Sequence, residues 1–503
     1  MASYHILRLF SFCFLLFSSA SSIERSTSDP SRCNAINSFL PGKVFFQGDG
    51  GYNASDESYF FAEARLRPAC IVTPTSATDV ATTIQVLGGN EQGSSAPLFA
   101  IRGGGLLPNI AAANIDGGVT IDLSAMNLTI VNEDKTIASI GSGARWGNVY
   151  RTLDAFTLGI VGARIATAGV GGYFVGGGLS FFSPQKGFGC DNLANIEIVL
   201  ATGEIVNANA SSNADLFTAL KGGSNNFGVV TRYDVQVFPQ GLYWGGAIEY
   251  PPSTIVQQLE AFATFKDPRN FDPYAEVELS FFFSGQSYTV ANNMFYTLPI
   301  VNASALQPFS DIQPQTLNTM RISNTSDFAE EIVAFQPSNP QGFFATTVFR
   351  TSLPLIQRIF SLWNDTTPLL QNVTGLLYNL DLQSVPTFIP GNSLGLENAA
   401  ANGSNHTGSL TICLLSNYWA DTADSPTMIF VTQNLLTQMK DAAKEQGLDE
   451  RWEYLNYASE FQHPIESYGA ASQANMRAVS KKYDPNCVFQ KQVPGGFKLF
   501  THI

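Results

Sequence analysis

The chain has 503 residues, of which 45% are hydrophobic, and a formal net charge of −14 at pH 7. This length predicts more than one lobe, and this share of apolar residues is ordinary for a globular protein with large buried cores. The acidity argues against nucleic acid as a partner, because phosphate binding needs a basic face, and we interpret it as an aid to solubility.

The N-terminal segment is typical of a secretory signal peptide over residues 1–22. Arg8 precedes an apolar stretch without charges at 9–17, and small residues follow at 18–22. The apolar stretch is too short to span a bilayer, and no later stretch is long and apolar enough to do so. We therefore expect a secreted or secretory-pathway protein without a membrane span.

Helices and strands alternate in the prediction up to about residue 240, which indicates an α+β or α/β lobe. Ser76 is expected to cap a helix that ends at Gly88. The other expected elements are strands at 97–101, 119–123 and 136–140, a helix with Trp146, Val149 and Leu153 on one face, a hairpin over 196–206 and a helix at 213–221.

Two glycine clusters stand out within this lobe, at 101–108 and 169–180. Consecutive glycines allow positive φ angles and close approach of a ligand to the backbone, and successive N–H groups in such turns can bind an anion. Two clusters in one lobe indicate a cradle for a large ligand that carries phosphate. Tight turns that pack strand on strand are the alternative for either cluster alone. Phe174 stands where a dinucleotide fingerprint needs its third glycine, which disfavours an NAD site.

From about Tyr243 the expected strands become longer and more aromatic, at 276–283, 343–351 and 410–417. Long helices intervene, and the clearest is predicted to start with Ser425 as its cap. This pattern predicts an antiparallel sheet backed by helices.

Five cysteines remain beyond the signal segment, so at least one thiol is unpaired, and a secretory route permits disulfides. Cys190 and Cys413 lie in apolar runs and are interpreted as inert buried thiols. Glycosylation sequons support secretion, and they begin at Asn53, Asn127, Asn209, Asn302, Asn324, Asn364, Asn372, Asn402 and Asn405.

These motifs, with Tyr454-Leu455-Asn456-Tyr457 and the tail at 483–497, resemble the FAD-linked oxidoreductases of the vanillyl-alcohol-oxidase type, in a fungal-looking version of their berberine-bridge-enzyme-like branch. The resemblance covers nearly the whole mature chain. It implies a two-lobed α+β fold: a PCMH-type FAD-binding domain at 33–240, a substrate domain with an antiparallel sheet backed by helices at 241–452, and a segment at 453–503 that returns to the FAD domain. It also implies a disulfide between Cys33 and Cys70.

The resemblance implies a set of FAD contacts, carried over by position. They are Arg102, Gly103, Gly104, Gly105, Leu106, Gly169, Gly171, Gly172, Gly176, Gly177, Asp191, Gly228 and Val230. For Asp191, a carboxylate that caps a turn is an equal alternative.

Two positions depart from the family. Leu106 replaces the histidine that bonds to the flavin ring, and Ile165 stands where doubly linked relatives have a cysteine. Neither side chain has a nucleophilic atom. Either FAD is held without a covalent bond, which retention of the other loop residues favours, or the fold has lost flavin use and performs redox-neutral chemistry.

The family's Tyr-x-Asn element faces the reactive side of the flavin, and Tyr454 and Asn456 match it. The resemblance therefore implies proton transfer at Tyr454 and orientation of the substrate by Asn456, with a half-buried structural pair as the alternative. His463 ranks below them, because a lone histidine is more often structural. Glu453 and Glu460 are candidate acids for an isomerisation.

Three functions remain open from the sequence. The first is oxidation of a small, largely apolar alcohol or secondary-metabolite intermediate by non-covalently held FAD, with molecular oxygen as the acceptor. The second is an isomerase or cyclase with flavin absent or only structural, and the third is a small-molecule binder without catalysis. Scattered histidines and the lack of C-x-x-C disfavour a metal site, and neither a nucleophile elbow nor a P-loop is present.

Overall fold

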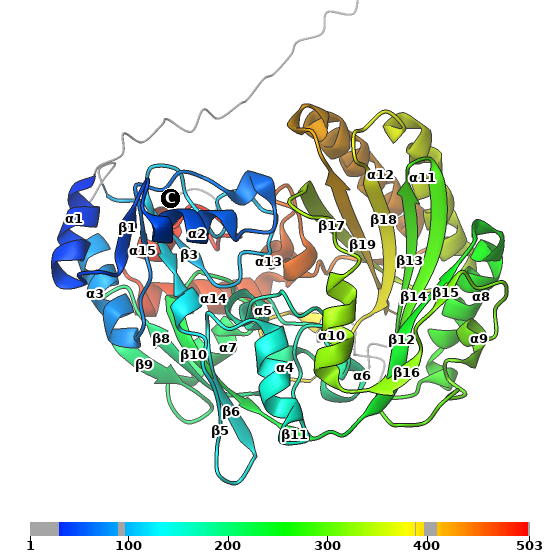
Figure 1. Ribbon diagram of the computed structural model, residues 1–503, viewed down its shortest axis with the longest axis horizontal. Helices are drawn as coiled ribbons and strands as arrows, with labels where there is room; N and C mark the ends of the chain where they lie inside the picture. Colours follow the sequence, from blue (N-terminus) through cyan, green and yellow to red (C-terminus); the bar gives the residue numbers. More distant parts are fainter. Residues whose placement is uncertain (1–29, 89–95, 388, 397–409, 501–503) are drawn as a thin grey trace, which may run out of the picture.

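The computed structural model describes residues 30–88, 96–387, 389–396 and 410–500. The predicted signal peptide and the sequons at Asn402 and Asn405 lie outside these ranges. Two lobes lie side by side in Figure 1: a first lobe coloured blue to green and red, and a second lobe coloured green to orange. The predicted two-lobed, mixed helix-and-sheet fold is confirmed.

The first lobe is built on two sheets. The four-stranded sheet has the order β1 (Val44–Phe46), β2 (Cys70–Val72), β4 (Val119–Asp122) and β3 (Phe99–Arg102). The five-stranded sheet has the order β5 (Thr129–Val131), β6 (Ile137–Gly141), β10 (Val229–Gln236), β8 (Leu193–Val199) and β9 (Ile205–Ala208), and β7 (Leu158–Gly159) pairs with β11 (Phe238–Pro239). Both glycine clusters follow strands of this lobe or their flanking turns.

Seven helices described in the first lobe surround these sheets. They are α1 (Pro30–Phe39), α2 (Gly50–Glu57), α3 (Ala77–Leu87), α4 (Trp146–Asp154), α5 (Val170–Val175), α6 (Ser183–Lys186) and α7 (Ala214–Leu220). The predicted cap of α3 is confirmed, since the Ser76 side chain accepts a hydrogen bond from the Asp79 N–H. Helices α1 and α2 were not predicted, because their sequences carry no strong apolar periodicity.

The second lobe is a nine-stranded sheet, largely antiparallel in pairing. Its strands are β12 (Tyr243–Tyr250), β13 (Ala275–Ser284), β14 (Ser287–Tyr296), β15 (Leu317–Asn318), β16 (Arg321–Ser323), β17 (Gln341–Arg350), β18 (Leu377–Ser384), β19 (Leu410–Trp419) and β20 (Asp449–Glu450). Its helices are α8 (Ile255–Phe265), α9 (Gln307–Ser310), α10 (Thr325–Val333), α11 (Leu353–Leu370) and α12 (Ser425–Glu445).

The two faces of this sheet differ because side chains alternate along each strand. On β13, Val277, Leu279 and Phe281 join a core with residues of α11 and α12, whereas Glu278 and Ser280 face the other way. Figure 1 shows α11, α12 and α8 on the outer side of the sheet. The inner face is therefore free to form one wall of a site between the lobes.

The predicted cap of α12 is wrong by one residue. Ser425 is the first residue of the helix, and its hydroxyl accepts a hydrogen bond from the Trp419 indole N–H at 3.1 Å. Asp421 instead caps the preceding 3-10 turn, which runs directly into the helix. The Ser425 hydroxyl, which the sequence pattern assigns to helix capping, therefore makes a tertiary contact with Trp419 instead.

The C-terminal tail lies against the first lobe. It contains α13 (Pro464–Ser467), α14 (Ala470–Tyr483) and α15 (Val488–Lys491), and Figure 1 shows α14 and α15 in red among the first-lobe elements. The Phe99 N–H donates to the Gln492 carbonyl, and the Asn226 side chain donates to the Phe497 carbonyl. The chain thus passes from the first lobe to the second and back.

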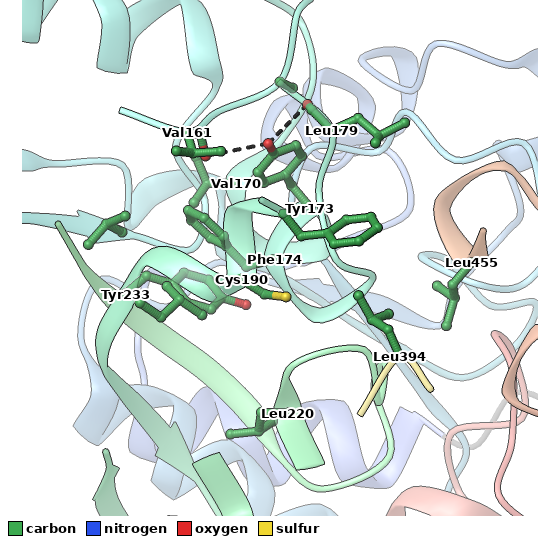
Figure 2. Close-up of a cluster of buried hydrophobic side chains, with 14 of the residues drawn as sticks. Val161, Val170, Tyr173, Phe174, Leu179, Cys190, Leu220, Tyr233, Leu394 and Leu455 are labelled. Carbon is green, nitrogen blue, oxygen red and sulfur yellow. Dashed lines mark hydrogen bonds between the residues drawn. The ribbon is translucent and has the colours of Figure 1, made fainter. Parts of the chain in front are cut away.

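The predicted disulfide between Cys33 and Cys70 is confirmed, and it ties α1 to β2. Cys190 and Cys413 are buried free thiols, and burial raises the pKa of both. Figure 2 shows the Cys190 side chain among apolar residues beside Phe174, as expected for an inert thiol. Within the described ranges, no helix is long and apolar enough to cross a membrane.

Candidate active site

A cavity of about 660 Å³ lies between the lobes. One side, here called the glycine wall, consists of Gly103, Gly104, Gly105, Leu106, Leu107, Gly169, Gly171 and Gly172. The opposite side, here called the polar floor, consists of Glu278, Ser280, Asn379, Asp381, Gln383 and Ser416 from the inner face of the sheet. The C-terminal segment contributes Tyr454, Asn456 and Tyr457 to the lining.

The two loops of the glycine wall pack backbone against backbone. A Cβ added at Gly104 would lie 2.5 Å from the Cα of Gly169, and one added at Gly171 would lie 2.8 Å from the Ser142 carbonyl oxygen. These positions need glycine because any side chain would drive the loops apart. At Gly172, by contrast, an added Cβ would meet no atom within 4 Å, since this residue faces open space.

Most of the predicted FAD contacts line the cavity. They are Gly103, Gly104, Gly105, Leu106, Gly169, Gly171, Gly172, Gly228 and Val230. Arg102, Gly176, Gly177 and Asp191 are not part of the lining. For these four residues the structure shows other roles, and a direct contact with a ligand in this cavity is not among them.

Arg102 is buried beneath the glycine wall and fastens α2 to β4. Its guanidinium donates to the Ser55 hydroxyl at 2.8 Å and lies 3.3 Å from Asp122. Its plane also lies over the Tyr59 ring, 3.8 Å from the centroid. The Arg102 side chain is therefore occupied inside the lobe, and the contact between Arg102 and the cofactor stays a prediction.

Gly176 and Gly177 make room for the Tyr-x-Asn element instead of lining the cavity. A Cβ at Gly176 would collide with the Asn456 side-chain oxygen, and one at Gly177 would lie 3.4 Å from the Tyr454 ring. The Gly178 N–H donates to the Tyr454 hydroxyl at 3.1 Å, and the Asn456 amide donates to the same hydroxyl at 3.2 Å. The element thus locks onto the second glycine cluster.

Asp191 caps a turn, which is the structural alternative considered for it. Its carboxylate accepts from the Phe188 N–H at 2.9 Å and from the Asn392 amide at 2.7 Å. Burial raises its pKa to about 6. Asn392 lies between β18 and β19 in the chain, so this carboxylate joins a first-lobe turn to a second-lobe loop.

The candidates for proton transfer, Tyr454, Tyr457 and His463, differ in burial, in hydrogen bonding and in whether they line the cavity. Tyr454 is 1% exposed, and its hydroxyl already accepts two hydrogen bonds. Tyr457, which the sequence reasoning missed as a candidate, points its hydroxyl at Arg164 and Gln383 in the cavity. His463 is exposed, lies outside the lining and precedes α13, so the structure does not bring it together with the two tyrosines, and its place in the site stays a prediction.

The polar floor contains a chain of hydrogen bonds from Asn379 to Asp381, and the side-chain oxygen of Asn379 has no partner in the described part of the chain. The Asn379 amide donates to the Ser416 hydroxyl at 3.1 Å, and that hydroxyl donates to Asp381 at 2.9 Å. Within the described residues, the Asn379 side-chain oxygen is buried without a hydrogen-bond partner. Burial raises the pKa of Asp381 to about 7. A buried unpaired acceptor next to a carboxyl of this kind indicates a place for a ligand donor.

The sequence did not reveal the polar floor, because its residues occupy every second position of strands whose other positions are mostly apolar. Glu278 and Ser280 of β13, and Asn379, Asp381 and Gln383 of β18, follow this spacing. The signal was present as polar residues alternating inside long aromatic strands. Without the sheet register, nothing in the sequence shows that the two sets face one cavity.

Leu106 and Ile165, the two positions expected to lack a covalent link, both line the cavity. No histidine or cysteine is found among the lining residues in the described ranges. The cavity wall therefore offers an apolar surface at both places where relatives carry a flavin bond.

Comparison with known proteins agrees with the geometry. The family model for the FAD binding domain matches residues 68–209. The FAD-dependent monooxygenase sdcF of Emericella nidulans is 35% identical, with 93% of this chain and 98% of that protein covered. The FAD-dependent monooxygenase tpcD of Cochliobolus heterostrophus is 32% identical over 98% of this chain and 99% of the relative.

Solved structures show the same fold at low identity. 6-Hydroxy-D-nicotine oxidase from Arthrobacter nicotinovorans superposes with a TM-score of 0.76 at 18% identity, covering 92% of this chain and 98% of that one. Physcomitrella patens BBE-like 1 gives a TM-score of 0.74 at 18% identity, covering 93% and 100%. The cofactor is FAD and the enzyme class is FAD-dependent oxidoreductase. The chain shares the fold of these two proteins, and its sequence places it in the family of FAD-dependent monooxygenases that includes sdcF and tpcD.

Proposed function

We propose that the protein is a secreted oxidase that removes a hydride and a proton from a small hydroxylated secondary metabolite, with FAD held non-covalently and molecular oxygen as the acceptor. The observation that carries the proposal is one cavity with the glycine wall on one side and the polar floor on the other. Such a cavity can hold a cofactor against a substrate that is oriented by side chains.

The residues of the glycine wall fit FAD. Gly103 to Gly105, Gly169, Gly171 and Gly172 would hold it through backbone groups, because these residues carry no side chain that could come between the backbone and a ligand in the cavity. Bound there, FAD supplies the acceptor for two electrons that leave a substrate C–H bond as a hydride. Since Leu106 and Ile165 offer no nucleophilic atom, retention rests on these non-covalent contacts.

The cavity argues for a substrate that is partly polar, which refines the expectation of a largely apolar one. Leu106, Leu107, Phe335 and Phe344 offer apolar surface. The polar floor adds acceptors, above all the unpaired Asn379 oxygen. We infer an apolar or aromatic body with at least one hydroxyl group that donates to Asn379 or Asp381.

The hydroxyl that is oxidised, which is not the one that donates to Asn379 or Asp381, needs a proton acceptor within the cavity, and Tyr457 is the better placed of the two tyrosines. Its hydroxyl contacts a guanidinium, which favours the deprotonated oxygen. Asp381 lies on the same floor and can hold a proton near neutral pH. Tyr454 and Asn456 hold the second glycine cluster and the element that carries Tyr457.

Secretion follows from the N-terminal segment and is supported by the sequons. Asn53, Asn127, Asn302 and Asn372 are exposed and open to glycosylation. Asn209 is only partly exposed and its amide donates to the Asn195 side chain at 3.0 Å, so we expect lower occupancy at this sequon than at the exposed ones. Mass spectrometry of the secreted protein before and after deglycosylation tests both points.

A second candidate reaction is monooxygenation, because the relatives that are about one third identical are named FAD-dependent monooxygenases. Turnover under isotopically labelled molecular oxygen separates the two reactions. Label in hydrogen peroxide and none in the product supports the oxidase, whereas label in the product supports the monooxygenase. A redox-neutral isomerase or cyclase would consume no oxygen at all.

The mode of FAD retention has its own test. Acid precipitation of the purified protein is expected to release yellow flavin into the supernatant. The Leu106→His variant is expected to keep part of its flavin in the precipitate, since the new imidazole would occupy the linking position. Flavin that stays with the wild-type precipitate would contradict non-covalent binding.

A further inference from the structure

Arg164 reaches from the first lobe into the polar floor and contacts four side chains. It lies on the segment between β7 and α5, directly before Ile165. That segment is fixed on its first-lobe side, because the Tyr150 hydroxyl donates to the Ala163 carbonyl at 2.6 Å. The guanidinium is 6% exposed, so its position is set by the groups around it.

Three of these groups belong to the second-lobe sheet. Arg164 Nη1 lies 2.9 Å from Glu276, Nε lies 2.9 Å from Glu278, and Nη2 donates to Gln383 at 2.6 Å. Side chains of β13 and β18 therefore bind all three nitrogens of the planar guanidinium group, and these contacts fix its orientation.

The fourth group is the Tyr457 hydroxyl of the C-terminal segment. Arg164 Nη2 donates to it at 3.1 Å, and the hydroxyl itself donates to Gln383 at 3.2 Å. The phenol oxygen is thus held between one donor and one acceptor, which points its remaining lone pair in a fixed direction. Arg164 is the only cation in the described residues that contacts this oxygen.

The charges that face Tyr457 act in opposite directions. Burial raises the pKa of Tyr457, the Arg164 charge lowers it, and the Glu278 carboxylate raises it. Burial also raises the pKa of Glu276 to about 8, so this second carboxyl carries little charge at neutral pH. The Tyr454 ring packs edge-on against the Tyr457 ring, with centroids 4.8 Å apart, and Tyr418 and Asp381 lie further along the lining.

We propose that Arg164 is a positioning residue that aims the Tyr457 hydroxyl at the substrate and stabilises its oxygen after the proton has left. The role rests on the proposed function of Tyr457 and extends it to a residue that neither the sequence reasoning nor the comparisons assign. The Tyr457 hydroxyl must first lose its own proton to solvent; the resulting phenolate would then accept the proton of the substrate hydroxyl, while the carbon that carries this hydroxyl would give up its hydride to bound FAD. Tyr457 then returns the proton to solvent.

The test follows the ionisation of Tyr457 without turnover. In protein labelled with isotopic tyrosine, the ring-carbon signal lost in Tyr457→Phe identifies this residue. Arg164→Gln is expected to move its titration up by at least about one pH unit, since a neutral amide leaves the phenolate beside Glu278. Glu278→Gln is expected to move it down. Arg164→Lys keeps the charge and should stay nearer the wild type.

A purely structural role would loosen the site in both variants and would not give shifts of opposite sign. Arg151→Gln, an exposed arginine that pairs with Glu330, is the matched control and should leave the titration unchanged. Equal titration in wild type and Arg164→Gln would overturn the proposal. The proposal would also be overturned if Tyr457 did not titrate at any pH below that of unfolding, in both the wild type and Glu278→Gln.

The pH dependence of flavin reduction by substrate separates this inference from the function beneath it. Arg164→Gln should shift its rising limb in the same direction as the tyrosine signal. If Tyr457→Phe leaves flavin reduction unchanged while Arg164 still moves the tyrosine signal, the proposed role of Tyr457 in the reaction fails and the coupling stands. If Tyr457→Phe slows reduction but Arg164→Gln moves neither measurement, the inference alone fails.

Discussion

The glycine wall and the polar floor face each other across one cavity, yet they are made in opposite ways. The wall is formed by backbone, and its specificity lies in side chains that are missing. The floor is formed by side chains on a rigid sheet, and its specificity lies in hydrogen-bonding groups left buried. Substitutions in the wall should therefore act through steric exclusion, and those in the floor through charge and proton affinity.

The largest effect is expected from Gly104→Ala. The added methyl group would sit 2.5 Å from the Gly169 backbone, so the two loops must separate. Overpacking of this kind costs about 1–3 kcal/mol, and here it also displaces the proposed FAD contacts. We expect purified protein without flavin and without activity, measured by absorbance and by thermal unfolding.

Two other glycines sharpen this prediction. Gly172→Ala places its methyl group in open space, so it should leave stability unchanged while weakening FAD binding. Gly50→Ala also meets no neighbour but lies in α2, away from the cavity, and should change neither quantity. Full flavin content in Gly104→Ala would show that the wall is not the cofactor site.

Tyr457→Phe should have the next largest effect. Removing the hydroxyl deletes the proposed proton acceptor, and general acid–base groups contribute about 10²–10⁴-fold to rates. We expect a loss of this size in kcat with flavin content unchanged, measured by steady-state kinetics at saturating substrate.

Tyr454→Phe is the matched comparison, three residues away on the same element. Its hydroxyl accepts from Gly178 and Asn456, so its loss leaves the buried Gly178 N–H unpaired and removes one of the two hydrogen bonds of the Asn456 amide, which should cost about 1–3 kcal/mol in stability. A larger fall in kcat for Tyr454→Phe than for Tyr457→Phe would restore the role that the family resemblance assigns to Tyr454.

The contrast between the glycine wall and the polar floor also explains which parts of the site could be predicted from the sequence. Glycine clusters are contiguous in the chain, so the wall and its lack of linking residues at Leu106 and Ile165 were visible. The floor joins Arg164 to Glu278, Gln383 and Tyr457, which lie more than a hundred residues from it and meet only through sheet register. No local pattern encodes that meeting.

Local reading also failed where a tertiary contact redirected a side chain. Arg102 ends β3 next to the first glycine cluster and was assigned to the FAD contacts by position, but its side chain pairs with Asp122 on the neighbouring strand. Ser425 has the residue type of a helix cap, but Trp419 takes its hydroxyl. In both cases the element was correctly predicted and the partner was not.

A smaller effect is expected from pH. Burial raises the pKa of Glu276 to about 8 and of Asp381 to about 7, so both carboxyls bind protons more tightly in the folded protein than in the unfolded chain. Their contribution to stability is therefore fully present at low pH and is lost as the pH rises through these values. Glu276→Gln cannot ionise and should reduce the fall in Tm between about pH 5 and about pH 9 by at least about 2 °C.

Asp381→Asn should reduce the same fall over a range about one unit lower. Because the glutamine at 276 can still accept from Arg164, loss of the hydrogen bond does not explain a flatter profile. An unchanged slope in both variants would show that Asp381 of the polar floor and Glu276, which pairs with Arg164, stay ionised in the folded protein, and this would weaken the contrast with the wall.

The smallest effect is expected from His463→Ala, which tests where the site ends. His463 is the only histidine in the described ranges, and its residue type made it a candidate. Its side chain is exposed and lies outside the cavity, while its carbonyl accepts the first hydrogen bonds of α13. Backbone carbonyls survive the substitution, so we expect kcat within about twofold and stability within about 0.5 kcal/mol of the wild type. A tenfold loss of kcat would extend the site beyond the polar floor and would mean that proton transfer leaves the cavity through the C-terminal segment.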